Sequence, residues 1–301
     1  MKNMNKYENC LLCPRKCGIN RRTGQTGVCG VSSEIKVARA ALHYWEEPCI
    51  SGKRGSGAVF FSGCSLHCVF CQNREISDGK EGKVISKERL SDIFMELADK
   101  GANNINLVTP GQYITDIVWA VNDAKSRGMK LPIIYNTSGY ENVTELKLLE
   151  GIVDVYLPDF KYMDSTLSAR YSRAKDYPSV AKQALSEMVR QQPDVVIDDS
   201  TGLIQKGVIV RQLLLPGHVN DAKDVLKYLY DTYHDHVYIS MMSQFTPIAL
   251  KDYPEINRTV TRRENERLVD YALEIGITNA FIQEGDVAKD SFIPAFDCEG
   301  V

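Results

Sequence analysis

Three cysteines lie close together in the stretch from Gly63 to Asn73. Cys64, Cys68 and Cys71 have the spacing C-x3-C-x2-C and follow the apolar run 58–61. Thiolates are the usual ligands of iron–sulfur clusters, so this loop could hold three corners of a cubane [4Fe–4S] cluster and leave one iron open to a small molecule. A zinc knuckle or buried free thiols are the alternatives, but structural zinc usually takes four ligands in C-x2-C pairs.

A second group of cysteines lies near the start of the chain. Cys10, Cys13, Cys17 and Cys29 have the spacing C-x2-C-x3-C-x11-C. Four thiolates close a tetrahedral site, and either zinc or a second iron–sulfur cluster fits this pattern. The spacing does not choose between them, although a chain that already uses cluster chemistry slightly favours the cluster. Because this segment is short, it can form only a small hydrophobic core, and the metal would supply much of its folding energy.

Composition excludes several classes of function. The 301 residues carry a formal net charge of -3, which gives no electrostatic support for binding nucleic acid. We find no apolar run long enough to span a membrane, and residues 1–6 contain no apolar signal region. We therefore expect a cytoplasmic protein, in which nine cysteines indicate metal sites rather than disulfides. Cys49 and Cys298 belong to neither group.

From residue 58 onward, strand-like and helix-like patterns alternate. This alternation predicts an α/β fold of parallel strands with right-handed crossovers, a partial (β/α)6 TIM-like barrel. The expected strands are Ala58–Ser62, Asn104–Thr109, Leu131–Asn136, Val153–Pro158, Val208–Leu215 and Val237–Met242, and a seventh can form at Asn279–Gln283. The expected helices are Ser86–Asp99, Tyr113–Arg127, Glu141–Leu149, Tyr177–Arg190, Asp221–Tyr233 and Arg262–Ile275.

We divide the chain into three parts. Residues 1–50 form a small N-terminal Cys-rich metal-binding segment, residues 51–250 the barrel, and residues 251–301 a C-terminal helix and tail that pack on the barrel. The stretch 191–206 has no helical pattern, and we expect an exposed hairpin there. Glu46, Glu47 and Cys49 precede the cysteine loop and either reach the site or belong to a packed linker.

Polar side chains gather where the expected strands end. The carboxyl ends of parallel strands form one rim in such barrels, and active sites lie there. Arg211 within an apolar strand needs an anionic partner, which a bound carboxylate or a protein carboxylate would provide. Asp159 and Lys161 are two residues apart and could share the cavity face or form a surface ion pair. Residues 136–139 could contribute polar groups or simply turn the chain.

The loop contains Cys64, Cys68 and Cys71, and Phe70 stands directly before the last cysteine. This pattern resembles the signature of the radical S-adenosylmethionine (SAM) superfamily. This resemblance implies that the amino and carboxylate groups of SAM chelate the open iron. One electron from the cluster then cleaves SAM to methionine and a 5′-deoxyadenosyl radical, which removes a hydrogen atom from the substrate. The carboxylate of SAM would be one candidate partner for Arg211.

The strand ends also resemble those of glycyl-radical activating enzymes. A Gly-Gly-Glu stretch receives the SAM amino group in that family, whereas residues 109–112 here read Thr-Pro-Gly-Gln, so the contact would shift to backbone or hydroxyl groups. From about residue 10 to about residue 285 the chain is more similar to the pyruvate formate-lyase activating enzyme-like subgroup, although Gln212 stands where we expect histidine. The implied SAM contacts are Phe70, Gln72, Asn73, Thr109, Pro110, Asn136, Ser138, Asp159, Lys161, Arg211 and Gln244.

These features predict a radical SAM enzyme that acts on an unknown substrate, which could be a small molecule or a protein. One alternative is an activase that acts on a glycine of a partner protein, but activases that carry extra clusters have them after the radical SAM motif, not before it. A second alternative is a non-catalytic iron–sulfur electron carrier, for which the polar strand ends would serve no purpose. The expected partner is an electron donor such as flavodoxin or ferredoxin.

Overall fold

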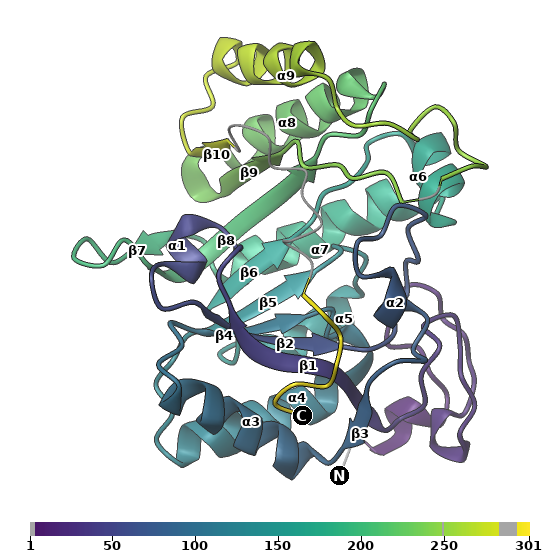
Figure 1. The fold of residues 1–301 in the computed structure, drawn as a ribbon, viewed down its shortest axis with the longest axis vertical. Coiled ribbons are helices and arrows are strands. Elements are labelled where there is room, and N and C mark those ends of the chain that lie inside the picture. The colour runs from purple at the N-terminus through teal and green to yellow at the C-terminus, as the bar shows by residue number, and fades with distance from the viewer. Residues whose placement is uncertain (1–3, 249, 283–293) are drawn as a thin grey trace.

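The computed structural model describes residues 4–248, 250–282 and 294–301, whose strands form one mixed sheet (Figure 1). Along the sheet the strand order is β10-β9-β8-β6-β5-β4-β2-β1-β3, and β7 pairs with β8 outside this path. The strand bounds are β1 Ile35–His43, β2 Ser56–Phe61, β3 Lys83–Ile85, β4 Ile105–Val108, β5 Ile133–Thr137, β6 Val155–Pro158, β7 Val196–Ile197, β8 Ile204–Leu213, β9 Tyr238–Met242 and β10 Ala280–Ile282.

Seven of the described strands run parallel, from β2 through β4, β5, β6, β8 and β9 to β10. The residues of β2, β4, β5 and β6 are all buried, as expected for parallel strands covered on both faces. The sheet ends at β3 on one side and at β10 on the other, so it does not close. This architecture confirms the predicted partial barrel, and β10 confirms the seventh strand.

Helices between the parallel strands cover the sheet and bury their apolar faces against it. Their bounds are α1 Pro48–Ser51, α2 Arg74–Ser77, α3 Lys87–Asp99, α4 Ile114–Ser126, α5 Val143–Leu146, α6 Ser165–Ser172, α7 Tyr177–Gln191, α8 Val219–Tyr233 and α9 Arg262–Glu274. Ser86 begins α3 as expected, because its hydroxyl accepts a hydrogen bond from the backbone N–H of Arg89 at 3.1 Å. None of the described helices is long and apolar enough to cross a membrane.

Three features of the fold lie outside the sequence-based expectation. Helix α6 was not predicted, because its sequence STLSARYS offers few apolar residues for a periodic pattern. Strand β8 begins at Ile204, before the predicted start, because it continues the hairpin that β7 forms within 191–206. Strand β1 pairs antiparallel with β2, so residues 35–43 of the Cys-rich segment extend the same sheet as the barrel.

The described C-terminal residues 294–301 lie along β1 (Figure 1). The backbone N–H of Cys298 donates to the Ala38 carbonyl at 3.0 Å, and the N–H of Ala40 donates to the Glu299 carbonyl at 2.8 Å. Phe296 packs edge-on against Phe60 of β2, with ring centroids 5.6 Å apart. These contacts place the tail next to β2, the strand that leads into the cysteine loop.

Candidate functional site

The cysteine loop begins after β2 at Gly63, a position where only glycine fits. Gly63 has a φ of +88°, and a Cβ atom there would lie 2.6 Å from the carbonyl oxygen of Cys29. Both the left-handed backbone and the close approach exclude a side chain. The loop that carries Cys64 is thus pressed directly against the N-terminal segment.

The three cysteines of the loop line one cavity of about 230 Å³ at the carboxyl ends of the parallel strands. Two of the sulfur atoms accept hydrogen bonds: Cys64 Sγ from the backbone N–H of Leu66 at 3.4 Å, and Cys68 Sγ from the Ser172 hydroxyl at 3.0 Å. Burial raises the pKa of the Cys68 thiol to about 11 and that of Cys71 to about 12. Iron binding at these thiols would therefore release their protons.

Phe70 fixes the last turn of the loop by packing into an aromatic group. Its ring centroid lies 5.7 Å from that of Phe245 and 6.4 Å from that of Tyr162. The backbone N–H of Val69 donates to the carbonyl of Tyr171 at 2.9 Å. These contacts hold Cys68 and Cys71 against residues that follow β6 and β9, so the cavity wall is assembled from segments far apart in the sequence.

Nearly all of the residues expected to contact SAM lie in the wall of this cavity. Pro110 is the exception, since it is buried and outside the described lining. Gln112 also turns away, because its amide donates to the carbonyls of Ser62 at 2.9 Å and Gly63 at 3.0 Å. The expected residues that line the cavity are Phe70, Gln72, Asn73, Thr109, Asn136, Ser138, Asp159, Lys161, Arg211 and Gln244.

Asp159 and Lys161 form an ion pair in the cavity wall rather than on the outer surface. Lys161 Nζ lies 2.6 Å from Asp159 Oδ2, and the two side chains are only 14% and 27% exposed. Burial would lower the pKa of Lys161, but the neighbouring Asp159 carboxylate outweighs it and raises that pKa above its usual value. The pair therefore presents a fixed positive and a fixed negative group at the end of β6.

Arg211 has two protein carboxylates as partners. Its guanidinium donates to Glu47 through Nε and Nη2, both at 2.7 Å, and also binds Glu46 through Nη2. Burial acts to lower the pKa of Arg211, but these carboxylates raise it above its usual value. Of the two partners considered for Arg211, the structure thus supplies the protein carboxylate, while the Arg211 side chain still lines the cavity.

The sequence alone does not decide the roles of the residues upstream of the loop. Glu46 lines the cavity and accepts a hydrogen bond from Asn106 Nδ2 at 3.0 Å, whereas Cys49 is buried in a separate apolar cluster. His43 and Trp45 also line the cavity and were missed, although both stand beside the Glu46-Glu47 pair in the sequence. Ser172 was missed because it belongs to α6, which was not predicted.

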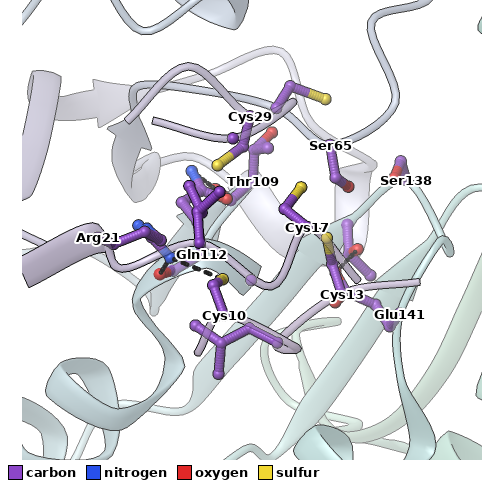
Figure 2. A pocket seen from close by; sticks show the side chains of 16 residues that line it. Cys10, Cys13, Cys17, Arg21, Cys29, Ser65, Thr109, Gln112, Ser138 and Glu141 are labelled. Atoms are coloured by element: carbon purple, nitrogen blue, oxygen red, sulfur yellow. Dashed lines mark hydrogen bonds between the residues drawn. The ribbon is translucent and has the colours of Figure 1, made fainter. Parts of the chain in front are cut away.

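The four N-terminal cysteines line a second, smaller cavity of about 30 Å³ (Figure 2). Cys64, Thr109, Thr137 and Ser138 line both cavities, so the two spaces share a wall. Among the described residues, no three His, Cys, Asp or Glu side chains converge closely enough to hold a single metal ion. This holds for the N-terminal group and for the loop group alike.

Comparison with known proteins agrees with this geometry. Residues 51–181 match the family described as "4Fe-4S single cluster domain", and that range contains Cys64, Cys68 and Cys71. The match supports a [4Fe–4S] cluster at these three cysteines, whose thiol donors and open cavity fit such a group. An uncharacterised protein of Methanocaldococcus jannaschii is 28% identical over 278 residues, which cover 89% of this chain and 75% of that protein.

Two solved structures share the fold. A radical SAM methyltransferase from Sphaerobacter thermophilus aligns with a TM-score of 0.51 and 16% identity over 76% of this chain and 66% of its own. Streptococcus suis SuiB bound to S-adenosylmethionine aligns with a TM-score of 0.50 and 14% identity, over 74% of this chain and 49% of its own. The chain spans about half the length of SuiB, and the fold is that of radical SAM proteins.

The ion pairs of Arg211 predict a large effect on stability. Replacing Arg211 with alanine leaves Glu46 and Glu47 buried without their cation, so the free energy of unfolding should fall by about 3–5 kcal/mol. Denaturant unfolding under anaerobic conditions measures this free energy. Arg262→Ala is the control, because its ion pair with Glu266 is 91% exposed on the arginine side and should contribute less than about 1 kcal/mol. Equal, small losses in both variants would contradict this role of Arg211.

Proposed function

We propose that this protein is a radical SAM enzyme whose Cys64, Cys68 and Cys71 hold a [4Fe–4S] cluster. The observation that carries the proposal is the single cavity in which these three cysteines meet ten of the eleven expected SAM contacts. When bound, the cluster would supply the electron that cleaves SAM to methionine and a 5′-deoxyadenosyl radical. The electron itself would come from a donor such as flavodoxin or ferredoxin.

In this proposal the chain's own residues bind and orient the ligands. The Asp159–Lys161 pair can accept a hydrogen bond from an ammonium and donate one to a carboxylate, the two charged groups of the methionine part of SAM. Thr109 offers a hydroxyl in the stretch where activating enzymes have a carboxylate, and Ser138 adds a second hydroxyl to the cavity wall. Phe70 and Phe245 form an apolar part of the wall. Phe70 is buried against Phe245, and this apolar surface would limit the access of water to radical chemistry beside it.

The substrate would enter from the side of β1 and the C-terminal residues. His43, Trp45, Phe60 and Pro294 line the main cavity and also an adjoining cavity of about 170 Å³. We propose a small molecule as the substrate, because the adjoining cavity is small and aromatic side chains line it. The similarity to glycyl-radical activating enzymes makes a glycine of a partner protein the second candidate.

Loss of the loop cysteines should remove the cluster and the activity together. Replacing any one of Cys64, Cys68 or Cys71 with alanine should abolish the cluster's visible absorbance and the release of 5′-deoxyadenosine with SAM and dithionite. Cys298→Ala is the matched control, since Cys298 lies in the C-terminal segment outside both described cavity walls. Cleavage of SAM retained by any of the three loop variants would refute the proposed cluster site.

The ion pair at the end of β6 should matter for SAM rather than for iron. Asp159→Asn removes a negative acceptor and should weaken SAM binding by roughly tenfold to a hundredfold, the scale of one hydrogen bond to a charged group. Calorimetry on reconstituted protein gives the affinity, and the iron content should stay unchanged. Asp198→Asn on the exposed β7–β8 hairpin is the control. Wild-type affinity in Asp159→Asn would place SAM elsewhere in the cavity.

The class of substrate can be tested with fractionated cell extract. An ultrafiltrate, which contains only small molecules, should raise the rate at which reconstituted protein releases 5′-deoxyadenosine above the rate with SAM alone. The protein fraction retained by the filter should not. Stimulation by the protein fraction alone, together with a radical signal in electron paramagnetic resonance (EPR) on a retained protein, would instead support an activase.

A further inference from the structure

We propose that Cys10, Cys13, Cys17 and Cys29 hold a second iron–sulfur cluster of the [4Fe–4S] type, with Arg21 as the buried cation that balances its charge. This site goes beyond the proposed function, which depends on the other group of cysteines. It lies in the smaller cavity and involves a different segment of the chain. The observations behind it are that the four thiols line one cavity without converging on a single point, and that Arg21 is buried beside them.

The N-terminal segment is folded so that its four cysteines face one space. Figure 2 shows the sulfur atoms of Cys10, Cys13, Cys17 and Cys29 arranged around the same cavity. Backbone hydrogen bonds hold these loops in place. In one of them, the N–H of Cys10 donates to the Ile19 carbonyl at 2.9 Å. These cysteines come from a stretch with only short 3₁₀ turns, so a shared ligand would join loops that have little regular secondary structure.

The surroundings of the sulfur atoms suit thiolates. Cys17 Sγ accepts a hydrogen bond from the backbone N–H of Val28 at 3.5 Å, and Cys10 Sγ accepts one from Arg21 Nη1 at 3.9 Å. A Cβ atom at Gly27 would lie 2.8 Å from Cys17 Sγ, so the backbone approaches the sulfur as closely as a glycine allows. Hydrogen bonds from N–H groups to sulfur are among the contacts that tune iron–sulfur clusters.

Arg21 is a buried cation whose hydrogen-bond partners among the described residues are three carbonyls and a thiol. The side chain is 1% exposed, and among the described residues it donates to the carbonyls of Val31 at 3.2 Å, Gln112 at 2.9 Å and Ser32 at 2.6 Å. A buried guanidinium is costly unless an anion lies near it. Four thiolates around a [4Fe–4S] core carry a net negative charge, and Cys10 lies within reach of Arg21.

The four described thiols line one space without converging on a single point, which favours a cluster over zinc. Zinc binds sulfur at about 2.3 Å, so the thiolates of a tetrahedral zinc site must converge on one point. The four cysteines line a common space, yet no three of the described metal-binding side chains converge in that way. In a cubane each thiolate binds a different iron atom, which requires the sulfur atoms to stand apart. The same holds for Cys64, Cys68 and Cys71, which line the main cavity without converging on a single point.

The location of the site links it to the first cysteine loop. Arg15 follows Cys13 in the N-terminal segment, and its guanidinium donates to the Ser65 carbonyl at 2.8 Å and the Ser172 carbonyl at 3.0 Å. His67 of the cysteine loop contacts the Val28 carbonyl at 2.5 Å. A cluster in the N-terminal segment would therefore stiffen the back of the loop that carries Cys64 and Cys68.

Metal analysis of two variants tests the site. A triple variant that replaces Cys64, Cys68 and Cys71 with alanine should retain about four iron atoms and four sulfides per chain after anaerobic reconstitution, since only the second cluster remains. A Cys10→Ala, Cys17→Ala double variant should instead lose about four of eight iron atoms. The Cys49→Ala, Cys298→Ala variant is the control and should retain all of them. About one zinc and no iron in the triple variant would overturn the cluster, and neither metal would overturn the site.

The role of Arg21 has its own measurement. Arg21→Gln in the triple variant should shift the midpoint potential of the remaining cluster to more negative values, because reduction adds an electron without the nearby positive charge. Arg21→Lys keeps the charge and should lie closer to the parent protein. Potentiometry followed by EPR measures both without any assay of activity. An unchanged potential in Arg21→Gln would overturn its role in charge balance, whereas failure of SAM cleavage alone would affect only the proposed function.

Discussion

The main cavity depends on a buried ion pair between β8 and the segment that precedes the barrel. Arg211 lies on a strand in the middle of the sheet, and Glu46 and Glu47 lie between β1 and α1. Neither partner could be buried alone without a large desolvation penalty, so each requires the other. The pairing fixes the β1–α1 connection across the strand ends, and it brings Glu46, Trp45 and His43 into the cavity wall.

Several further contacts join the Cys-rich segment to the barrel. Strand β1 adds to the sheet next to β2, Arg15 binds backbone carbonyls on both sides of the cysteine loop, and Gly63 permits the loop to touch Cys29. Gln112 adds a further tie, since its side chain binds the end of β2 while its carbonyl accepts from Arg21. These contacts place the two cysteine groups on opposite sides of one shared wall.

Much of this arrangement follows from sequence patterns. The spacing of Cys64, Cys68 and Cys71 predicts the cluster loop, and the alternation of strands and helices predicts a parallel sheet whose strand ends meet at one edge. That is why ten of eleven expected SAM contacts lie in one cavity. Pro110 is the exception because the chain turns into a 3₁₀ helix at Gly111, which buries the proline.

Other features depend on tertiary contacts that no local pattern encodes. The choice between a ligand carboxylate and a protein carboxylate for Arg211 is decided by Glu46 and Glu47, which lie more than 160 residues away along the chain. Helix α6 has little apolar periodicity and depends on its tertiary contacts. The hydrogen bond from Ser172 to Cys68 therefore could not be predicted from the sequence. Antiparallel pairing of β1 with β2 likewise required the three-dimensional register.

The charges of the cavity fit the proposed ligand as a set. Among the ion-paired side chains, Glu46, Glu47 and Asp159 carry three negative charges, and Arg211 and Lys161 carry two positive charges, which leaves one negative charge in excess. The thiolates of a bound cluster would add to this negative charge. SAM carries a sulfonium, an ammonium and a carboxylate, a net charge of plus one.

Electrostatic interactions are stronger in a site of low effective dielectric than in water, so this balance matters more in the cavity than on the surface. Because Glu47 is bound on both oxygens by Arg211, the excess negative charge is available at Asp159 and Glu46, the two carboxylates that line the cavity. The wall therefore attracts a cation beside the cluster loop, and Lys161 still offers a donor for the ligand's carboxylate.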